Sequence, residues 1–321
     1  MAENRVVGIP TPRVEGEDKV AGRAVYAGDV LLPGMLWVKV LRSPIPHGRI
    51  KRIDTRKAEE LAGVKAVVTG RDVTGSRIGK KIMDMPILAE GVARFIGEKV
   101  AAVAAQTEEI AEQALDLIEV EYEELESVSD PLEALKPSAP VLHPELPSYT
   151  GLLPFGFPQG ELVEPHDIKE PGNVFVHLTW KKGDLGEGFR QSDRIVENTF
   201  RTAMAHQGYI EPHAFLVETN EDGGADIWAS TKSPFALRGQ IGAALKVPPA
   251  KLVVHPCYIG GDFGGKGDSN DIALCYVLSK KSGCPVKMVV DASEEFIAGN
   301  PRHAAVITIR TGVKKSGEIL A

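Results

Sequence analysis

The stretch that most constrains this chain is a glycine-rich loop between a predicted strand and a predicted helix. In the sequence Gly260-Gly261-Asp262-Phe263-Gly264-Gly265-Lys266, four glycines flank one aromatic residue and a lysine follows at once. Residues 251–255 before it are predicted to form a strand, and apolar residues recur at helical spacing from Asp271. Glycine permits positive φ angles and lets a ligand approach the backbone. In such a loop, backbone N–H groups converge on an oxyanion or phosphate. Residues 260–266 are called the glycine loop below.

Two interpretations of the glycine loop follow from its residues alone. The spacing Gly260-x-x-x-x-Gly265-Lys266 nearly fits a nucleotide-binding P-loop. However, Gly267 stands where a Ser or Thr should supply the magnesium-binding hydroxyl, which argues against an NTPase. The other interpretation is a strand-to-helix turn that binds no ligand.

Other short motifs precede the loop in a definite order. They are Lys19-Val20-x-Gly22-x-Ala24-x-Tyr26, Phe95-Ile96-Gly97-Glu98-Lys99-Val100, Val120-Glu121-Tyr122-Glu123, Gly183-Asp184-Leu185 with Phe189 and Asp193, Ile195-Val196, and Tyr209-Ile210-Glu211. Together with Gly-Gly-x-Phe-Gly-Gly-Lys, this order resembles the xanthine dehydrogenase family, the molybdenum hydroxylases. The resemblance runs from about Val14 to the last residue and is more specific than any single motif.

The resemblance and the element pattern together predict a mixed α/β (α+β) fold. We expect an aldehyde oxidase/xanthine dehydrogenase a/b hammerhead domain at 1–128 and the first part of the molybdopterin-binding domain at 173–321. Between them, residues 129–172 form a proline-rich linker, because proline fixes φ and removes backbone donors.

Several local predictions accompany this division. Residues 99–105, a helix capped by Thr107 and residues 120–122 are expected to form a β-α-β unit whose strands can lie parallel. Gly183-x-x-Gly186-x-Gly188 is interpreted as a turn rather than a dinucleotide fingerprint. His143 and His166 are expected to be ordinary surface histidines.

Composition limits the partners and the compartment. The 321 residues carry a net charge of −7 without a block of like charge, which argues against nucleic acid as the main partner. No apolar run reaches the length of a membrane span, and no signal-peptide core follows the N-terminus, so we expect a cytoplasmic chain. Cys257, Cys275 and Cys284 lack C-x-x-C spacing, so we expect reduced thiols and no iron–sulfur cluster on this chain.

The resemblance also implies roles for particular residues. Gly261, Phe263, Gly264 and Gly265 would approach the cofactor with their backbone. Phe263 would also wall the substrate pocket, and Asp268 is a candidate for substrate contact in place of the glutamate that purine-oxidising relatives carry at the position of Gly267. No residue is expected to ligate the metal directly, and Pro212 between His206 and His213 argues against zinc.

The family commonly places a glutamine near the metal. Counting back from Glu211, the position of that glutamine is Ala205 in this sequence. Two alternatives follow: Gln207 makes the contact through a local shift, or the contact is absent.

By resemblance, the chain would be a subunit of an oxidoreductase that hydroxylates an N-heterocycle or aldehyde carbon with water-derived oxygen. Its cofactor would be molybdenum–molybdopterin, with the cytosine dinucleotide form favoured. No catalytic residue is expected on this chain; a general-base glutamate is expected on a partner chain. The segment 318–321 is predicted to open a returning strand, and a second molybdopterin-binding subunit is expected to complete the sheet.

Electrons would pass to Fe2S2 and FAD, carried by an Fe–S subunit and an FAD subunit. Two alternatives stand beside this hydroxylase: a non-catalytic scaffold subunit of such a complex, and a P-loop-like nucleotide-binding enzyme.

Overall fold

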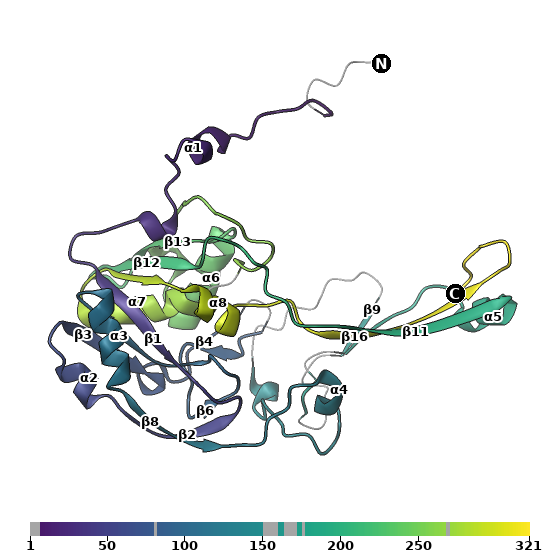
Figure 1. The fold of residues 1–321 in the computed structure, drawn as a ribbon, viewed down its shortest axis with the longest axis horizontal. Helices are drawn as coiled ribbons and strands as arrows, with labels where there is room; N and C mark the ends of the chain where they lie inside the picture. The colour runs from purple at the N-terminus through teal and green to yellow at the C-terminus, as the bar shows by residue number, and fades with distance from the viewer. Residues whose placement is uncertain (1–6, 80–81, 150–159, 164–171, 175–176, 268–269) are drawn as a thin grey trace.

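The computed structural model describes residues 7–79, 82–149, 160–163, 172–174, 177–267 and 270–321. Figure 1 shows a body of strands and helices from which a long two-stranded ribbon extends. The mixed α/β character expected from the sequence is confirmed.

A seven-stranded sheet forms the centre of the body. Its order is β14 (Leu252–His255), β13 (Ala225–Ala229), β12 (Ala214–Thr219), β15 (Val286–Val289), β1 (Leu36–Arg42), β7 (Lys99–Ala105) and β3 (Val64–Thr69). Only the β13–β14 and β1–β15 pairs of this sheet are parallel. The β1–β15 pair joins strands from both predicted domains, so 1–128 and 173–321 share one sheet. Their boundaries remain a prediction.

Helices cover both faces of this sheet, and β7 shows why its residues are small. All seven of its residues are buried, as expected from the sequence. Ala102 and Ala104 pack into the core formed with α6 (Pro234–Leu245) and α7 (Asn270–Ser282). Ala101, Val103 and Ala105 pack, on the other face, with residues of α2 (Arg56–Glu60) and α3 (Glu108–Asp116). Small alternating side chains let both helical layers approach one strand.

The remaining elements lie around the body and along the ribbon. The helices are α1 (Gly16–Val20), η1 (Ala27–Asp29), η2 (Gly70–Val73), α4 (Pro131–Ala134), η3 (Leu146–Ser148), α5 (Leu185–Gln191), η5 (Pro249–Lys251) and α8 (Ala292–Ala298). The strands are β2 (Gly48–Asp54), β4 (Arg77–Ile78), β5 (Met85–Pro86), β6 (Val92–Ala93), β8 (Glu119–Glu124), β9 (Gly160–Val163), β10 (His177–Trp180), β11 (Arg194–Thr202) and β16 (Ala305–Val313).

Two predictions of secondary structure are wrong. β7 and β8 do not form one parallel unit: β7 lies antiparallel between β1 and β3, whereas β8 pairs with β2 in a separate sheet ordered β6-β2-β8. The expected turn at Gly183–Gly188 is instead the start of α5. There the Asp184 side chain accepts a hydrogen bond from the Glu187 N–H at 3.0 Å, which is enough to begin a short helix.

The prediction for His143, in the proline-rich segment, is also wrong. Its Nδ1 lies 2.8 Å from the Tyr149 hydroxyl, and burial, together with the nearby charge of Arg94, lowers the pKa of His143 to about 4. It is therefore not an ordinary surface histidine. Residues 150–159 and 164–171, including His166, lie outside the described residues.

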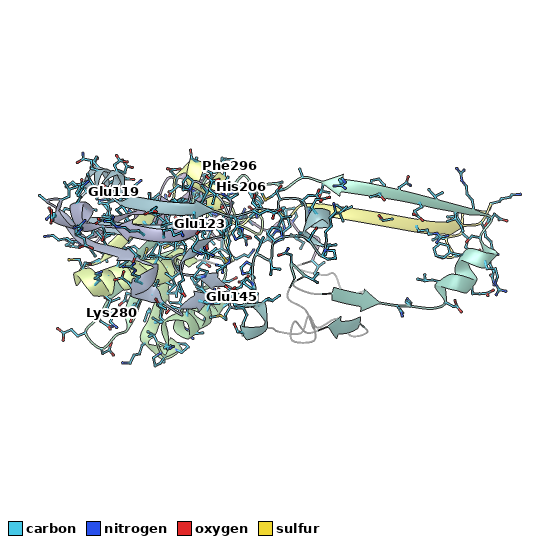
Figure 2. All side chains as sticks on the ribbon, turned by 90° about the horizontal axis from the view of Figure 1, so that it is seen from below. Glu119, Glu123, Glu145, His206, Lys280 and Phe296 are labelled. Atoms are coloured by element: carbon cyan, nitrogen blue, oxygen red, sulfur yellow. The ribbon has the colours of Figure 1, made fainter. Side chains whose placement is uncertain are left out.

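The ribbon consists of β11 and β16, which pair antiparallel from Arg194↔Val313 to Thr202↔Ala305. Its strands stand clear of the body in both views (Figures 1 and 2). Beyond β16 the chain turns, and the N–H of Lys314 donates to the Glu318 carbonyl at 2.9 Å. The predicted return of 318–321 along the ribbon is confirmed by the Val313↔Ile319 bridge.

Candidate functional site

The glycine loop connects β14 to the segment before α7, as the sequence predicts. Gly261, Phe263 and Gly264 have φ angles of 122°, 45° and 97°. A left-handed conformation costs a residue with a Cβ about 1–2 kcal/mol, so the conformation of Phe263 must be held by its surroundings. Strain of this kind is common where a loop meets a ligand.

Asp262 shapes the loop from inside. Its Oδ1 accepts the Lys266 N–H at 2.6 Å, and its Oδ2 accepts the Gly264 N–H at 3.0 Å. Lys232 Nζ also donates to Oδ2 at 2.6 Å. Burial would raise the pKa of this carboxyl, but the hydrogen bonds from Lys232, Gly264 and Lys266 outweigh burial and lower it. Asp262 is thus held ionised as an acceptor within the loop.

Arg302, just before β16, supports the strained residue from outside. Its Nη2 donates to the Phe263 carbonyl at 2.6 Å. A Cβ on Gly264 would lie 3.1 Å from the same nitrogen, so the guanidinium sits close against the glycine backbone. Phe263 as a whole is 64% exposed. Arg302 therefore fixes the backbone while the ring stays free to contact another molecule.

Tyr209 lies directly against the loop. A Cβ on Gly265 would lie 2.6 Å from Tyr209 Cε1 and 3.2 Å from Gln207 Cδ. A Cβ on Gly261 would lie 3.1 Å from Tyr209 Cβ. Residue 265 must therefore be glycine for reasons of space, and at residue 261 positive φ adds to the crowding.

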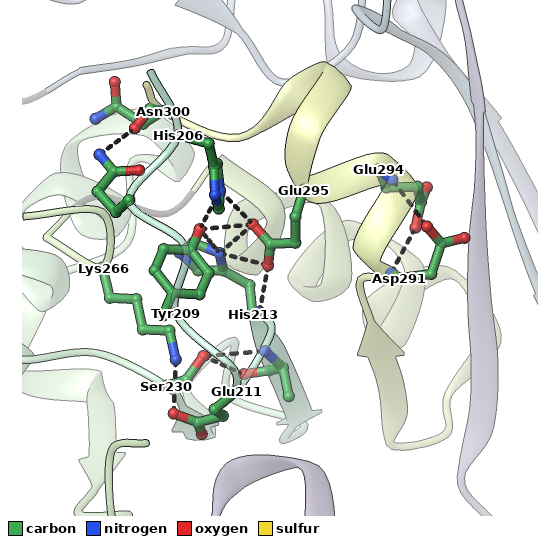
Figure 3. A network of polar contacts seen from close by, with 12 residues as sticks. His206, Tyr209, Glu211, His213, Ser230, Lys266, Asp291, Glu294, Glu295 and Asn300 are labelled. Carbon is green, nitrogen blue, oxygen red and sulfur yellow. Dashed lines mark hydrogen bonds and ion pairs between the residues drawn. The ribbon is translucent and has the colours of Figure 1, made fainter. Parts of the chain in front are cut away.

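Tyr209 belongs to a buried polar network (Figure 3). Its hydroxyl donates to Glu295 Oε2 at 2.6 Å, and His213 Nδ1 lies 2.9 Å from Glu295 Oε1. His206 Nδ1 accepts the Gly208 N–H at 3.1 Å, so its Nε2 carries the hydrogen that points at the Tyr209 hydroxyl, 3.2 Å away. Figure 2 also places His206 beside Phe296 of α8, with ring centroids 4.8 Å apart. The network ties the segment before β12 to α8.

The network also sets its own protonation. Burial, reinforced by the Glu295 carboxylate, raises the pKa of Tyr209. Burial would also raise the pKa of Glu295, but the hydrogen bonds from His213 and Tyr209 lower it on balance. Tyr209 is thus a neutral donor and Glu295 an ionised acceptor. Among the described residues, no three His, Cys, Asp or Glu side chains are grouped so that they could hold a metal ion.

Lys266 points into the protein. Its side chain is 0% exposed, and its Nζ lies 2.6 Å from Glu211 Oε2 and 4.8 Å from the centroid of the Tyr209 ring. The same Glu211 oxygen accepts the Gly260 N–H at 2.6 Å. A P-loop lysine must reach out to phosphates, so this inward direction argues against the nucleotide-binding alternative, as does Gly267.

The structure brings most of the predicted site residues together. Gln207 packs against Gly265, and its Nε2 donates to the Asn300 carbonyl at 2.7 Å. Gly261, Phe263 and Gly264 follow around the same loop, whereas Asp268 lies outside the described residues. Ala205, at the position counted for the family's glutamine, is engaged through its backbone in a bridge to Arg302.

Sequence reasoning missed the supports of the loop. The sequence does not predict the contacts of Arg302 and Glu295 or the pairing of Glu211 with Lys266. One signal was present: a lysine within a glycine run that becomes buried needs a carboxylate nearby. For Arg302 and Glu295 the sequence offers no local signal, because both follow β15 in the chain and reach the loop or Tyr209 only through the fold.

The loop fits the pterin cofactor that the resemblance implies. Gly261 and Gly264 carry no side chain, although Tyr209 and Arg302 pack where a Cβ would lie, and Phe263 is exposed to a ligand. Beside them, Gln207 Oε1 is buried and has no hydrogen-bond partner among the described residues. An unpaired buried acceptor is costly unless a bound group completes it.

A separate cavity of about 300 Å³ lies at the base of the ribbon. It is lined by Ser129, Asp130, Pro131, Arg201, Thr202, Ala304, Ala305 and Val306. No residue of the glycine loop lines it, and Arg201 and Asp130 already pair there at 3.2 Å. The geometry at Phe263 and Gln207 is the better guide to chemistry. Within the described ranges, no helix is both long enough and apolar enough to cross a membrane.

Comparison with known proteins agrees with this geometry. Residues 166–321 match the molybdopterin cofactor-binding domain, and residues 21–126 match the aldehyde oxidase and xanthine dehydrogenase a/b hammerhead domain. A probable xanthine dehydrogenase subunit of Bacillus subtilis (strain 168) is 38% identical over 310 residues, covering 96% of this chain and 38% of that protein. The nicotinate dehydrogenase large molybdopterin subunit of Eubacterium barkeri is 32% identical over 318 residues, covering 99% and 69%.

A solved structure is similar over the same length. The crystal structure of quinoline 2-oxidoreductase from Pseudomonas putida 86 matches with a TM-score of 0.80 and 27% identity, covering 97% of this chain and 38% of that one. The chain thus spans well under half of two of these three proteins and about two thirds of the Eubacterium barkeri subunit. The two matched domains, the identity over nearly the whole chain and the glycine loop agree. The chain belongs to the xanthine dehydrogenase family of oxidoreductases, the molybdenum hydroxylases, and carries the hammerhead domain and molybdopterin-binding sequence of their large subunits.

Proposed function

We propose that this chain is part of the molybdopterin-binding subunit of a hydroxylase that inserts water-derived oxygen at a carbon of an N-heterocycle or aldehyde. The observation that carries the proposal is the glycine loop lying beside the buried Gln207 Oε1, which has no hydrogen-bond partner in the part of the chain that the structure describes. The molybdenum–molybdopterin cofactor would supply the two-electron redox chemistry when bound. The protein's own residues would bind it, orient it and shape the substrate pocket.

Each site residue has a proposed task that its environment supports. Gly261, Gly264 and Gly265 would offer a backbone without obstructing side chains. A hydrogen-bond donor of the cofactor would pair with the buried Gln207 Oε1. Of the two alternatives for the family's glutamine contact with the metal site, we therefore favour Gln207 over the absence of the contact. Phe263, which is 64% exposed and whose carbonyl is held by Arg302, would wall the substrate pocket.

Among substrates, an N-heterocycle is favoured over an aldehyde. The names of the compared relatives contain nicotinate, quinoline and xanthine, which are all N-heterocycles. Xanthine itself is disfavoured, because the buried Gly267 carries no carboxylate where purine-oxidising relatives are expected to have one. Asp268 remains the proposed substitute.

Other polypeptides would supply the rest of the reaction. We propose that the general-base glutamate lies on a second molybdopterin-binding subunit. The ribbon supports this proposal, because one of its faces carries the exposed apolar side chains of Phe200, Ile307 and Ile309, which suit a protein contact. Three dispersed cysteines cannot hold Fe2S2, so the proposal places the clusters and FAD on further subunits. The free thiols suit the cytoplasm, and the cytosine dinucleotide form of the pterin is the proposed form.

Metal and pterin analysis of the complex isolated with this chain tests the proposal. We expect molybdenum and a pterin in about equal amounts with the chain. A complex with neither molybdenum nor tungsten would overturn it.

A second measurement separates the proposal from the scaffold alternative: Phe263→Asp in an intact complex should lower turnover strongly, whereas unchanged turnover would favour a scaffold.

A further inference from the structure

One carboxylate oxygen holds both ends of the glycine loop. Glu211 Oε2 accepts the N–H of Gly260, the first residue of the loop, at 2.6 Å. It also accepts a hydrogen bond from Nζ of Lys266, the last residue, at 2.6 Å. Figure 3 shows the Lys266 side chain extended down to Glu211. Glu211 therefore links the first residue of the glycine loop to the last.

The packing around this pair leaves little freedom. A Cβ on Gly260 would lie 2.7 Å from Glu211 Cβ, so the backbone sits directly on the glutamate. Lys266 is enclosed between Glu211 and the face of Tyr209, whose hydroxyl is fixed by Glu295. Tyr209 is in turn in close contact with Gly261 and Gly265.

Stability alone is a poor explanation for such a pair. Desolvating two charges offsets most of their attraction, and apolar residues of similar volume often replace a buried pair without loss of stability. Lys266 is completely buried and Glu211 is 13% exposed, so the desolvation is large. What an apolar pair cannot supply is a fixed direction and distance between the two loop ends.

The position of Glu211 in the chain gives that geometry a use. Gln207, Tyr209 and Glu211 lie on one short segment before β12. Asp262 shapes the loop internally, but Glu211 fixes the loop relative to the segment that carries Gln207. Glu211 therefore fixes the position of the glycine loop relative to Gln207, and these are the two proposed contacts of the cofactor.

We propose that Glu211 and Lys266 are positioning residues that hold the glycine loop in register with Gln207 and so orient the backbone that receives the cofactor. This inference rests on the proposed function. It assigns neither residue a contact with the cofactor or a step in the chemistry.

The double variant Glu211→Leu/Lys266→Met tests the proposal in the intact complex. It removes both charges while keeping apolar volume, so the complex should melt near the wild-type temperature. We expect hydrogen–deuterium exchange at residues 260–266 to become at least about tenfold faster, because bonds to a charged group are lost. The electron paramagnetic resonance signal of the metal in its one-electron state should also shift.

Lys39→Met/Glu108→Leu is the control. That pair, with a separation of 2.7 Å, joins β1 to α3 within the hammerhead segment, and neither residue is near 260–266 in the sequence. It should leave loop exchange and the resonance signal unchanged. If Glu211→Leu/Lys266→Met does not fold, Glu211→Asp decides, because it keeps the charge balance but shortens the reach. Faster exchange confined to 260–266 supports positioning, and wild-type exchange overturns it.

Two failures can be told apart by measuring metal in the wild-type complex first. A wild-type complex without molybdenum or tungsten refutes the proposed function. A wild-type complex that contains the metal, with a double variant matching it in loop exchange and resonance signal, refutes the positioning role alone.

Discussion

Gly265 shows how a single missing Cβ can determine a site. Its backbone lies against the Tyr209 ring and the Gln207 amide, so any side chain there competes with both. Phe263, in contrast, carries a side chain although its backbone has a positive φ angle, a conformation that favours glycine. Both residues are held by neighbours distant in sequence, and this makes the loop sensitive to small substitutions.

Gly265→Ala should destabilise the protein and lower its cofactor content. The added Cβ would lie 2.6 Å from Tyr209 Cε1, and overpacking of this kind costs typically about 1–3 kcal/mol. Melting temperature and molybdenum content of the complex are the measurements. Gly239→Ala is the control, since a Cβ on this exposed glycine of α6 meets nothing within 4 Å and should stabilise the helix by roughly 0.5–1 kcal/mol. Equal effects of the two variants would contradict the prediction.

His143 should make the stability of the chain sensitive to acid. Its pKa is about 4 in the folded protein instead of the ordinary 6.5, so the unfolded chain takes up a proton first as the pH falls. The contribution of the neutral His143 side chain to the free energy of unfolding is therefore complete above pH 6.5 and is lost as the pH falls to about 4. At full titration this separation is worth roughly 3 kcal/mol.

Denaturant unfolding between pH 7 and 4 measures this effect. His143→Asn should show a shallower loss of stability in that window than the wild type. The exposed His303 provides the control variant His303→Asn, which should follow the wild type. Parallel curves for the wild type and His143→Asn would show that the buried imidazole is not responsible.

At the scale of elements, the ribbon of β11 and β16 has two unlike faces. Residues paired across the strands share a face, so Phe200 lies with Ile307, and Asn198 with Ile309. Val196, Phe200, Ile307 and Ile309 together give this face exposed apolar side chains. The other face is mainly polar, with Thr199 and Thr308 hydrogen-bonded at 2.9 Å and Glu197 beside Arg310, although Ile195 is also exposed there. An exposed apolar sheet face is typical of a surface that another polypeptide covers.

Ile309→Ser should weaken binding of the proposed second molybdopterin-binding subunit. Burying one isoleucine side chain is worth about 1.5–3 kcal/mol, so the dissociation constant should rise by roughly tenfold or more. Ile195→Ser on the opposite face is the matched control, because Ile195 is also exposed, at 42% against 51% for Ile309. Titration of the isolated subunits measures both affinities, and equal losses would contradict a face-specific contact.

At the scale of the whole molecule, the two predicted domains are joined by more than a linker. β1 lies beside β15 within one sheet, and Leu36 pairs with Val286. Ion pairs cross the same junction: Lys99 with Asp271 at 2.7 Å, and Arg42 with Glu294 at 2.8 Å. The hammerhead segment and the molybdopterin-binding segment therefore share their core.

This shared sheet predicts a single cooperative unfolding transition in calorimetry. Lys99→Met should lower that whole transition, because Asp271 would lose its buried partner at a cost on the order of 3 kcal/mol. Lys99→Met/Asp271→Leu should recover most of the loss. Two resolved transitions, only one of which shifts in Lys99→Met, would show that the segments unfold independently.

The sequence alone determined the local features and the family. Glycine spacing predicted the strand, loop and helix around Phe263, because the need for positive φ and the helical period are encoded by near neighbours. Motif order predicted the xanthine dehydrogenase family, which the comparisons confirmed. The boundaries at 128 and 173 and the roles of the site residues stay predictions.

The tertiary structure decided which distant residues meet. Glu211 and Lys266 are 55 positions apart, and β1 and β15 about 250, so no local pattern could pair them. The same reason explains the wrong prediction for β7 and β8: strand length and polarity fit a parallel unit, but β1 and β3 occupied both edges of β7. Local propensity fixes what an element is, whereas burial and charge pairing over the whole chain fix where it lies.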